Sequence, residues 1–453
     1  MSVEQVKRAL AGLTMRDDAE AKDLWSKDES DQGRFPPELV VFPTTSAEVA
    51  HVIRTCAAHG VPVTPVGGRT GKSGGSLPTR GGVCLSLEKM NRILAVRPGD
   101  LTVTVQPGVV LSDLQREVES QQLFYPPDPN SGVACTLGGN IAENAGGPSA
   151  LKYGVTRDYV LGLEWVLPSG EVVRVGRNTI KGVAGYDLVG LFVGSEGTLG
   201  VATEITLKLL PLPRVVMTAL LPFADVLTAA RAVNAVLLGG LLPRCLELLD
   251  DVALAAIAGK GVPFPAGAGA VIIAEVDGSS EEGVFADLNA LAGICRANGC
   301  QEPQIAVDRD QRARLWNTRK LVSPSLREMK KYKFSEDIVV PRSKLPEAIE
   351  RFKAMGRALG LTVATYGHAG DGNLHTNVLY ADPSERPRVD EALAEIMKIT
   401  VALGGTITGE HGVGIAKKKF LSLEQSAEVI ALQQKLKVAI DPQVVLNPGK
   451  IFD

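Results

Sequence analysis

The chain has 453 residues, of which 45% are apolar and 22% charged, and its formal net charge is -3. This length exceeds what one hydrophobic core usually organises, so we expect two or three domains. The near-neutral charge argues against nucleic-acid binding, and the apolar content is ordinary for a globular protein.

The targeting and redox signals indicate a cytoplasmic protein. The first twenty residues carry charges throughout and lack the apolar core of a signal peptide. No run of about 18 uncharged apolar residues predicts a transmembrane segment. The cysteines are scattered without a CxxC pair, so we expect buried thiols instead of disulfides or cluster ligands. They are Cys56, Cys84, Cys135, Cys245, Cys295 and Cys300.

The first clear element is a helix between Thr45 and Gly60. Thr45 and Glu48 have capping-box spacing, and apolar residues from Val49 to Ala57 recur on one helical face. The following VPVTPV reads as a strand that leads into glycine-rich residues. Further strands are predicted at VCLSL, LTVTV, LEWVLP, EVVRV and VATEITLKL, each bounded by glycine or proline.

Glycine-rich segments punctuate this first half: GGRTGKSGG, TLGGNIAENAGG and GSEGTLG. The first contains Gly71-Lys72-Ser73, but a P-loop would need glycine where Val66 stands, so the nucleotide-triphosphate motif fails. GxGxxG is absent, so a Rossmann site has no support. Several glycine segments interleaved with Thr, Ser and Asn predict close backbone approach to a large ligand. Consecutive N–H groups suit a pyrophosphate, which favours a dinucleotide.

These segments, together with PPDPNSGVAC, KYGVTRD and the closing NPGK, resemble a known family. They are similar to the FAD-binding domain of the vanillyl-alcohol-oxidase and cresol-methylhydroxylase (PCMH-type) fold. More narrowly they resemble its D-2-hydroxyacid dehydrogenase branch, which includes D-lactate dehydrogenases, glycolate oxidase flavin subunits and D-2-hydroxyglutarate dehydrogenases. The resemblance covers nearly the whole chain in the expected order.

The resemblance implies an FAD site. Residues 67–71 and Ser73 would wrap the pyrophosphate, the 136–147 segment would line the ribityl chain and the flavin, and Ile205 would lie near the adenine. The cradle motifs contain no histidine, so FAD should be non-covalent. The expected cofactor-binding residues are Gly67, Gly68, Arg69, Thr70, Gly71, Ser73, Pro127, Asp128, Thr136, Gly138, Gly139, Ala142, Asn144, Gly147, Glu196, Gly200, Ile205 and Asn447.

The second half contains a predicted metal site. LTVATYGH and LHTNVLY are strand-like, and Asp371-Gly372 predicts a type I′ hairpin turn. With the turn centred there, His368 faces His375 directly, with β-carbons roughly 4.5–5.5 Å apart. Glu410 would complete a two-histidine, one-carboxylate site for Zn²⁺, Fe²⁺ or Mn²⁺. Metal-dependent members of the resembling family carry ligands at these positions.

His411 follows the predicted ligand Glu410 and is our candidate general base, because imidazole titrates near neutral pH. It would take the substrate's hydroxyl proton with metal assistance while hydride passes from C2 to flavin N5. The resemblance implies that Arg319 binds the substrate carboxylate. Ser323, Lys333 and Asn377 are the other expected substrate-binding residues. A second anchor for a distal carboxylate does not align cleanly, which favours a small acid, D-lactate or glycolate.

The expected fold is α+β. An N-terminal helical segment (1–30) precedes an FAD domain of two α+β subdomains (31–212). A ferredoxin-like substrate domain that carries the metal site (213–422) follows, and residues 423–453 return to the FAD domain.

Rival readings stay open at this point. One is a metallohydrolase in which the histidines and Glu410 activate water. Another is a flavin-dependent transferase on the same fold, such as an ether-lipid synthase. Because no cluster motif exists, electrons would leave through oxygen, a diffusible acceptor or a partner. Such a partner would be an electron-transfer flavoprotein or a quinone-linked iron–sulfur subunit. A homodimer is also expected.

Overall fold

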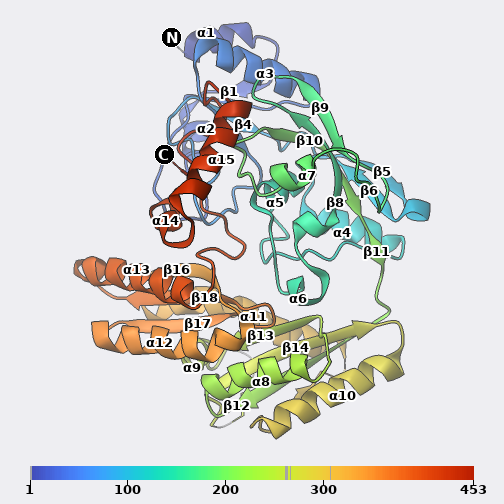
Figure 1. Cartoon of the computed structure of the whole chain (residues 1–453), viewed down its shortest axis with the longest axis vertical. Coiled ribbons are helices and arrows are strands. Elements are labelled where there is room, and N and C mark those ends of the chain that lie inside the picture. Colours follow the sequence, from blue (N-terminus) through green and yellow to red (C-terminus); the bar gives the residue numbers. More distant parts are fainter. Residues whose placement is uncertain (1–2, 261–263, 266, 307, 453) are drawn as a thin grey trace. The chain divides into compact units, whose positions relative to one another are not determined.

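The computed structural model describes residues 3–260, 264–265, 267–306 and 308–452 (Figure 1). Its contacts divide the chain into two compact units. Unit 1 comprises residues 1–146, 155–212 and 410–453, and unit 2 comprises 147–154 and 213–409. Compared with the expected domains, the return to the first unit starts at Glu410 instead of Leu423, and a short piece after Gly146 groups with unit 2.

Unit 1 contains two main sheets. In the first, β2, β4 and β3 are parallel and β1 pairs antiparallel with β2. The second is antiparallel with the order β5-β6-β10-β8-β9. The strands are β1 (Met15–Arg16), β2 (Leu39–Val41), β3 (Val63–Val66), β4 (Val83–Ser86), β5 (Ile93–Arg97), β6 (Thr102–Val105), β8 (Val160–Val166), β9 (Val172–Gly176) and β10 (Val201–Lys208), with a small pair β7 (Leu123–Phe124) and β11 (Leu210–Pro211).

The helices of unit 1 include the one expected between Thr45 and Gly60. Thr45 accepts a hydrogen bond from Glu48 N, and Gly60 ends the helix in the left-handed conformation. Glu48, however, accepts from Thr44 N. The helices are α1 (Val3–Ala9), α2 (Ala19–Leu24), α3 (Ser46–His59), α4 (Leu111–Ser120), α5 (Leu137–Glu143), α7 (Leu188–Phe192), α14 (Leu421–Glu424) and α15 (Ala427–Ile440), with short 3-10 turns η1 (Pro98–Asp100), η2 (Thr156–Tyr159) and η5 (Lys418–Phe420).

The core of unit 1 lies between α3 and the first sheet. Val49, Val52 and Ile53 of α3 pack with Val41 and Val63 of that sheet, and all are fully buried. The C-terminal segment joins the same sheet, because Leu446 forms a parallel bridge with Val63. Burial of this apolar face stabilises the edge from which the glycine-rich loop leaves β3.

Unit 2 is a seven-stranded antiparallel sheet with the order β15-β12-β14-β13-β17-β18-β16. Helices α9 and α11 share a buried cluster with one face, and α8, α10, α12 and α13 gather on the other (Figure 1). The elements are β12 (Val215–Phe223), β13 (Cys245–Leu249), β14 (Ala270–Gly278), β15 (Gln304–Ile305), β16 (Tyr332–Val339), β17 (Thr362–His368), β18 (Asn373–Tyr380), α6 (Ala150–Tyr153), α8 (Val226–Leu238), α9 (Asp251–Ile257), α10 (Glu281–Ala297), α11 (Arg309–Met329), α12 (Leu345–Leu359), α13 (Arg386–Ala402), η3 (Arg342–Lys344) and η4 (Pro383–Glu385).

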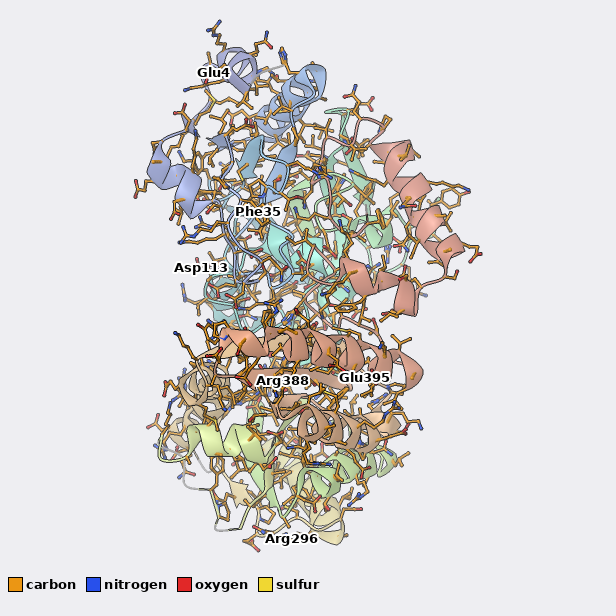
Figure 2. The ribbon with its side chains drawn as sticks, turned by 90° about the vertical axis from the view of Figure 1, so that its left-hand side faces the viewer. Glu4, Phe35, Asp113, Arg296, Arg388 and Glu395 are labelled. Carbon is orange, nitrogen blue, oxygen red and sulfur yellow. The ribbon has the colours of Figure 1, made fainter. Side chains whose placement is uncertain are left out.

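Helix α13 illustrates how the outer helices divide their faces. Its Leu393, Ile396 and Met397 are buried. The charged side chains of Arg388 and Glu395 instead extend outward from the helix (Figure 2). This apolar-in, charged-out pattern is what an amphipathic helix packed on a sheet requires. The structure thus confirms the α+β class.

The segment 147–154 is held within unit 2 by Asp277 of β14. Lys152 Nζ donates to the Asp277 carbonyl oxygen at 2.9 Å, and Tyr153 Oη donates to Asp277 Oδ2 at 2.8 Å. The Asp277 side chain is buried, so these polar contacts take the place of water. This explains why a segment flanked on both sides by unit 1 residues groups with unit 2.

Two further expectations concern cysteines and membranes. All six cysteines are unbridged thiols, and all except the half-buried Cys300 are buried, as expected. None of the helices in the described part of the chain has both the length and the apolar character needed to cross a membrane.

The predicted hairpin exists, but its expected register is wrong. Tyr366 pairs with His375, a shift of two residues from the expected pairing of His368 with His375. Of Asp371 and Gly372 only the glycine has a positive φ, so no type I′ turn forms, and a four-residue loop (369–372) joins the strands. Because the shift is even, both histidines keep the same face of the sheet.

Gly372 generates a stability prediction. Its φ is 92°, and a β-carbon there would lie 2.1 Å from the Val340 carbonyl oxygen. Gly240, with φ 82°, has nothing within 4 Å of its hypothetical β-carbon. We expect Gly240→Ala to cost about 1 kcal/mol from backbone conformation alone. Gly372→Ala should cost about 3 kcal/mol or more, because the backbone must also move. Urea denaturation of both variants measures the difference, and equal costs would contradict the clash.

Candidate functional site

The two histidines of the hairpin lie side by side in unit 2. Their ring centroids are 5.3 Å apart and their planes are nearly perpendicular. His368 ends β17, and His375 lies in β18, diagonally across the pair of strands. Both side chains are buried. The register correction therefore leaves the predicted neighbours together.

Each histidine has a buried carboxylate opposite it on the next strand outward. Glu247 of β13 is paired in register with His368, and Asp337 of β16 is paired with His375. His368 Nδ1 is hydrogen-bonded to Glu247 Oε1, and His375 Nδ1 lies 3.9 Å from Asp337 Oδ1. Carboxylates in this position orient an imidazole and increase its basicity.

Glu247 also holds Arg319. Arg319 Nε donates to Glu247 Oε2 at 2.6 Å, so one carboxylate binds the guanidinium and an imidazole together. Burial by itself would raise the pKa of Glu247, but the charges and hydrogen bonds of His368 and Arg319 outweigh it and lower the pKa to about 2. Glu247 is thus a fixed negative charge.

Arg319, expected to bind the substrate carboxylate, is buried in α11. Its guanidinium carbon lies 4.7 Å from the centre of the Tyr366 ring. Its Nη2 is buried and has no hydrogen-bond partner among the described residues. A buried guanidinium N–H without a partner is costly, which suits a group that receives an anionic ligand.

The other expected substrate residues fall into two places. Lys333 Nζ donates to Ser323 Oγ at 2.7 Å, so these two contact each other. Asn377 is fully buried on β18, where its Nδ2 donates to the His375 carbonyl oxygen at 2.8 Å. Its Oδ1 has no partner among the described residues.

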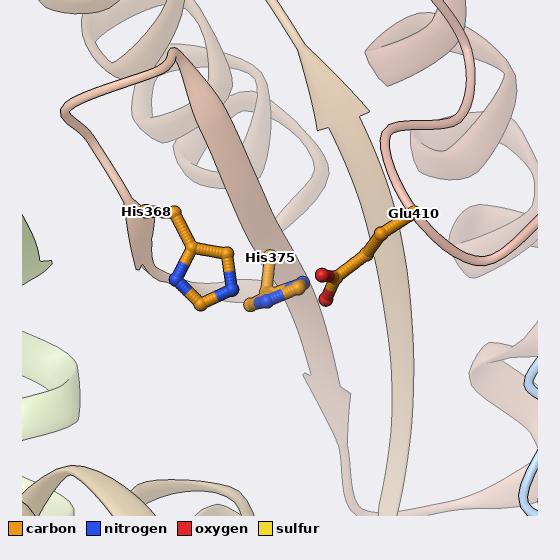
Figure 3. A group of neighbouring side chains, drawn as sticks. All are labelled: His368, His375 and Glu410. Carbon is orange, nitrogen blue, oxygen red and sulfur yellow. The ribbon is translucent and has the colours of Figure 1, made fainter. Parts of the chain in front are cut away.

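Glu410 stands where the chain leaves unit 2. The preceding residue, Gly409, is held because its N–H donates to Asp337 Oδ2 at 2.9 Å. A β-carbon on Gly409 would lie 2.3 Å from Asn373 Nδ2, so any other residue there would displace the Asn373 side chain. Figure 3 shows the Glu410 carboxylate turned toward the histidines, and one ligand atom from each of the three residues lies within 4.8 Å of the others.

His411 is half-buried, and its Nε2 lies 3.6 Å from Glu410 Oε1. The next residues are attached to unit 1. Ile415 N donates to the Ser73 carbonyl oxygen at 2.9 Å, and Ala416 N donates to the same oxygen at 3.1 Å. The loop that carries His411 is therefore hydrogen-bonded to the glycine-rich loop after β3.

The glycine-rich loop approaches the 134–139 segment closely. A β-carbon at Gly67 would lie 2.6 Å from Thr136 Oγ1, and one at Gly68 would lie 2.4 Å from the Ala134 carbonyl oxygen. Gly138 is similarly confined by Pro107, whereas Gly71 has nothing within 4 Å. Gly67 and Gly68 thus allow the loop to approach the 134–139 segment closely, whereas the space beside Gly71 is open.

Arg69 lies in this loop with its side chain directed elsewhere. Its φ is 58°, its Nη1 donates to the Leu24 carbonyl oxygen at 2.9 Å, and its guanidinium lies 4.6 Å from the centre of the Trp25 ring. The neighbouring Thr70 is half-buried. Arg69 can therefore offer its backbone to a ligand while its side chain anchors the loop to α2.

Several expected cofactor residues hold segments of unit 1 together. Asn447 Nδ2 donates to the carbonyl oxygens of Gly75 and Glu196, both at 2.8 Å. Asn144, with φ 55°, accepts from Arg157 N at 2.9 Å. Their side chains are engaged in protein contacts, so their role in cofactor binding stays a prediction that would depend on the backbone they shape.

The remaining expected residues are dispersed. Ile205 is fully buried in the middle of the second sheet. Gly200 (φ 154°) packs against Trp165, Pro127 accepts from Gln115 through its carbonyl oxygen, and Asp128 and Gly139 are half-buried. Ala142 accepts from Glu196 N, and Gly147 belongs to unit 2.

Comparison with known proteins identifies the family. The model of the FAD linked oxidases, C-terminal domain, matches residues 212–451, and the model of the FAD binding domain matches residues 37–176. The chain belongs to the FAD-linked oxidases.

Individual relatives cover the chain almost completely. It is 41% identical to "Glycolate oxidase subunit GlcD" of Bacillus subtilis, over 100% of this chain and 97% of that protein. It is 35% identical to "D-lactate dehydrogenase" of Anaerostipes hadrus, over 98% of this chain and 94% of that protein.

Solved structures support the fold. The chain matches p-cresol methylhydroxylase with a TM-score of 0.79 at 18% identity, covering 100% of this chain and 96% of that one. It matches an alkyldihydroxyacetonephosphate synthase with a TM-score of 0.78 at 19% identity, covering 99% and 88%. At these identities the likeness concerns the fold, and it confirms the expected PCMH-type architecture.

The residues of unit 1 fit the FAD expected of this family. Buried hydroxyl oxygens of Ser73, Thr136 and Ser195 have no hydrogen-bond partner among the described residues. All three lie in the glycine-rich segments. Buried hydroxyls without partners are costly unless a ligand satisfies them, and a dinucleotide offers many acceptors.

Sequence reasoning missed the two buried acids paired with the histidines, Glu247 and Asp337, and the half-buried Glu143. Glu247 stands inside CLELL and Asp337 inside SEDIVV, both strands that are otherwise largely apolar or edge-like. A carboxylate inside a buried strand must have a cationic or donor partner, and this signal could have identified Glu247. Glu143 lies within the glycine-rich segment TLGGNIAENAGG, where the sequence shows no residue that would pair with its carboxyl group.

The low pKa of Glu247 predicts a pH-dependent contribution to stability. A carboxyl lowered from 4.5 to about 2 contributes about 3 kcal/mol above pH 4.5, and this is lost as the pH falls toward 2. Glu247→Gln should therefore lower the free energy of unfolding of the chelator-treated protein by about 3 kcal/mol at pH 7. The difference between the wild type and the variant should become smaller as the pH falls. Urea denaturation across this pH range measures it.

Glu395→Gln, on the surface of α13, is the control and should change stability by less than about 0.5 kcal/mol. A wild-type minus Glu247→Gln difference that stays constant between pH 7 and pH 3 would contradict the assigned charge.

Proposed function

We propose that this chain oxidises a small 2-hydroxy acid to the 2-oxo acid with non-covalently bound FAD. D-lactate is the first candidate substrate and glycolate the second, and D-2-hydroxyglutarate is the less favoured alternative. The observation that carries the proposal is the buried carboxylate of Glu247, which joins a guanidinium and a histidine in one arrangement. Relatives named for glycolate and for D-lactate support the substrate class.

In this proposal Arg319 binds the substrate carboxylate. Glu247 accepts from Nε, and Nη2, which has no partner among the described residues, would donate to one oxygen of the substrate carboxylate. Asn377 contributes its buried amide from β18, and Ser323 and Lys333, which are hydrogen-bonded to each other, are the other proposed substrate contacts. Because Lys333 and Ser323 already contact each other, the arrangement favours a substrate without a second carboxylate.

We propose that His368, His375 and Glu410 bind a divalent ion, Zn²⁺, Fe²⁺ or Mn²⁺. Two imidazoles and one carboxylate with outer carboxylate partners are a fitting donor set for these ions. With Nδ1 directed at Glu247, His368 would bind through Nε2. Such an ion would supply positive charge beside the substrate's hydroxyl oxygen.

His411 is the proposed general base. It follows Glu410 directly, and its ring is half-buried 3.6 Å from that carboxylate. In the reaction the hydroxyl proton passes to His411. FAD, when bound, supplies the acceptor for the hydride that leaves C2. We propose that FAD contacts the residues of the glycine-rich segments and the residues that hold these segments in place.

Two other functions remain testable. A metallohydrolase would use the same three ligands but would need no flavin. A flavin-dependent transferase would share the fold, and one structural neighbour is named as an alkyldihydroxyacetonephosphate synthase. For the electrons we propose transfer to an electron-transfer flavoprotein or a quinone-linked iron–sulfur subunit, and we propose that the enzyme is a homodimer.

Anaerobic titration separates these functions. We expect flavin absorbance to bleach with D-lactate, glycolate or both, and to remain unchanged with L-lactate. Chelation should slow bleaching by about 100-fold, and added Zn²⁺, Fe²⁺ or Mn²⁺ should restore it. Flavin-free purified protein that hydrolyses esters would favour the metallohydrolase, and flavin that no 2-hydroxy acid reduces would favour the transferase.

Replacing His411 tests the base. His411→Ala should lower the rate of flavin reduction by about 10²–10⁴-fold, because no group then takes the hydroxyl proton. FAD content should stay at the wild-type level. His59→Ala, in the last turn of α3, is the matched control and should reduce flavin normally. Wild-type reduction rates in His411→Ala would refute the assignment.

A further inference from the structure

Glu196 is a junction of three segments in unit 1. Its backbone has a φ of 51°, which a non-glycine residue adopts only when its surroundings enforce it. Its N–H donates to the Ala142 carbonyl oxygen at the end of α5, and its own carbonyl oxygen accepts from Asn447 Nδ2. Both distances are 2.8 Å. The residue is therefore fixed from two sides before its side chain is considered.

The Glu196 carboxylate binds a fourth segment. Oε1 accepts from Val413 N and Oε2 accepts from Gly414 N, both at 2.7 Å. Two successive backbone N–H groups that converge on one carboxylate form an anion-binding nest. These amides follow His411 by two and three residues. The side chain thus ties down the 410–414 loop, which carries the proposed ligand and the proposed base.

A second carboxyl lies beside the same loop. A β-carbon at Gly412 would be 2.2 Å from Glu143 Oε2 and 3.0 Å from Glu196 Oε1. Glu143 Oε1 in turn lies 2.8 Å from the position of a β-carbon at Gly75 in the glycine-rich loop. Oε2 is buried and has no partner among the described residues. Gly412 is required here because any side chain would displace these carboxyls.

The surroundings assign different charges to the two carboxyls. Burial raises the pKa of Glu143 well above its usual value, and the negative charges of Glu196 and Asp28 raise it further. Burial also raises the pKa of Glu196, but the N–H groups of Val413 and Gly414 and the charge of Lys450 oppose that rise. Glu196 is the favoured anion, and Glu143 is the favoured neutral acid.

We propose that Glu196 is the positioning residue of the 410–414 loop, with Glu143 as its neutral neighbour. Through this carboxylate the loop that presents His411 becomes part of the same hydrogen-bonded framework as α5, the glycine-rich loop and Asn447. Glu196 then acts on the reaction through the backbone of the loop instead of by touching substrate. The role of the loop in catalysis rests on the proposed function, whereas its anchoring does not.

Hydrogen exchange of the FAD-loaded protein tests the anchoring directly. In the wild type the amides of Val413 and Gly414 should exchange slowly compared with unstructured backbone. Glu196→Gln should accelerate their exchange at least about tenfold, because glutamine offers one acceptor oxygen for two N–H groups. Glu143→Gln should leave it unchanged, since the amide imitates a neutral acid. Glu204→Gln, in an ion pair on the second sheet, is the control.

A functional readout accompanies the exchange. With a 2-hydroxy acid substrate and FAD-loaded protein, Glu196→Gln should lower kcat more than it changes KM, and Glu204→Gln should change neither. Fast exchange of the Val413 and Gly414 amides in the wild type would overturn the proposal even if Glu196→Gln fails to fold. Equal acceleration by Glu143→Gln and Glu196→Gln would overturn the assignment of charge.

The two proposals can fail separately. If no 2-hydroxy acid reduces the flavin, the proposed function falls, and the exchange rates still decide whether Glu196 anchors the loop. If substrate is oxidised but Glu196→Gln changes neither the exchange of the Val413 and Gly414 amides nor kcat, the positioning role of Glu196 is refuted and the proposed function stands.

Discussion

The contact between Glu247 and its two partners determines the geometry of unit 2 around the histidines. A carboxylate with no exposure to solvent must be balanced by charge and hydrogen bonds, and Arg319 and His368 supply both. Because each carboxylate oxygen takes one partner, neither side chain can move without leaving the other poorly satisfied. The guanidinium and the imidazole are therefore held in a fixed relation that their positions in α11 and β17 alone would not ensure.

Asp337 repeats this arrangement for the second histidine and extends it to the chain that follows. It faces His375 across the strands, accepts from Asn373, and receives the N–H of Gly409. The position of Glu410 is consequently set by a strand residue far away in sequence. A residue of the sheet thus fixes the backbone immediately before Glu410.

Much of this could be predicted from the sequence. The helix ending at Gly60, the strand before the glycine-rich loop and the pair of hairpin histidines follow from local patterns, which depend on neighbours in the chain. The register of the hairpin could not be read from Asp371-Gly372, because contacts with Val340 shape the loop. Glu247 and Asp337 escaped because their partners come from distant segments. Local patterns do not reveal which strands become neighbours, and only neighbours explain a buried acid.

The left-handed backbone of Arg69 bears on how such chains are recognised and engineered. The loop requires a particular torsion there, and arginine meets it because its side chain leaves the loop to stack on an indole. A search pattern that insists on glycine at this position would overlook relatives that satisfy the torsion by other means. Conversely, glycine in place of Arg69 would relax the backbone torsion but would remove the hydrogen bond to Leu24 and the contact with Trp25, so the loop would be attached less firmly to α2.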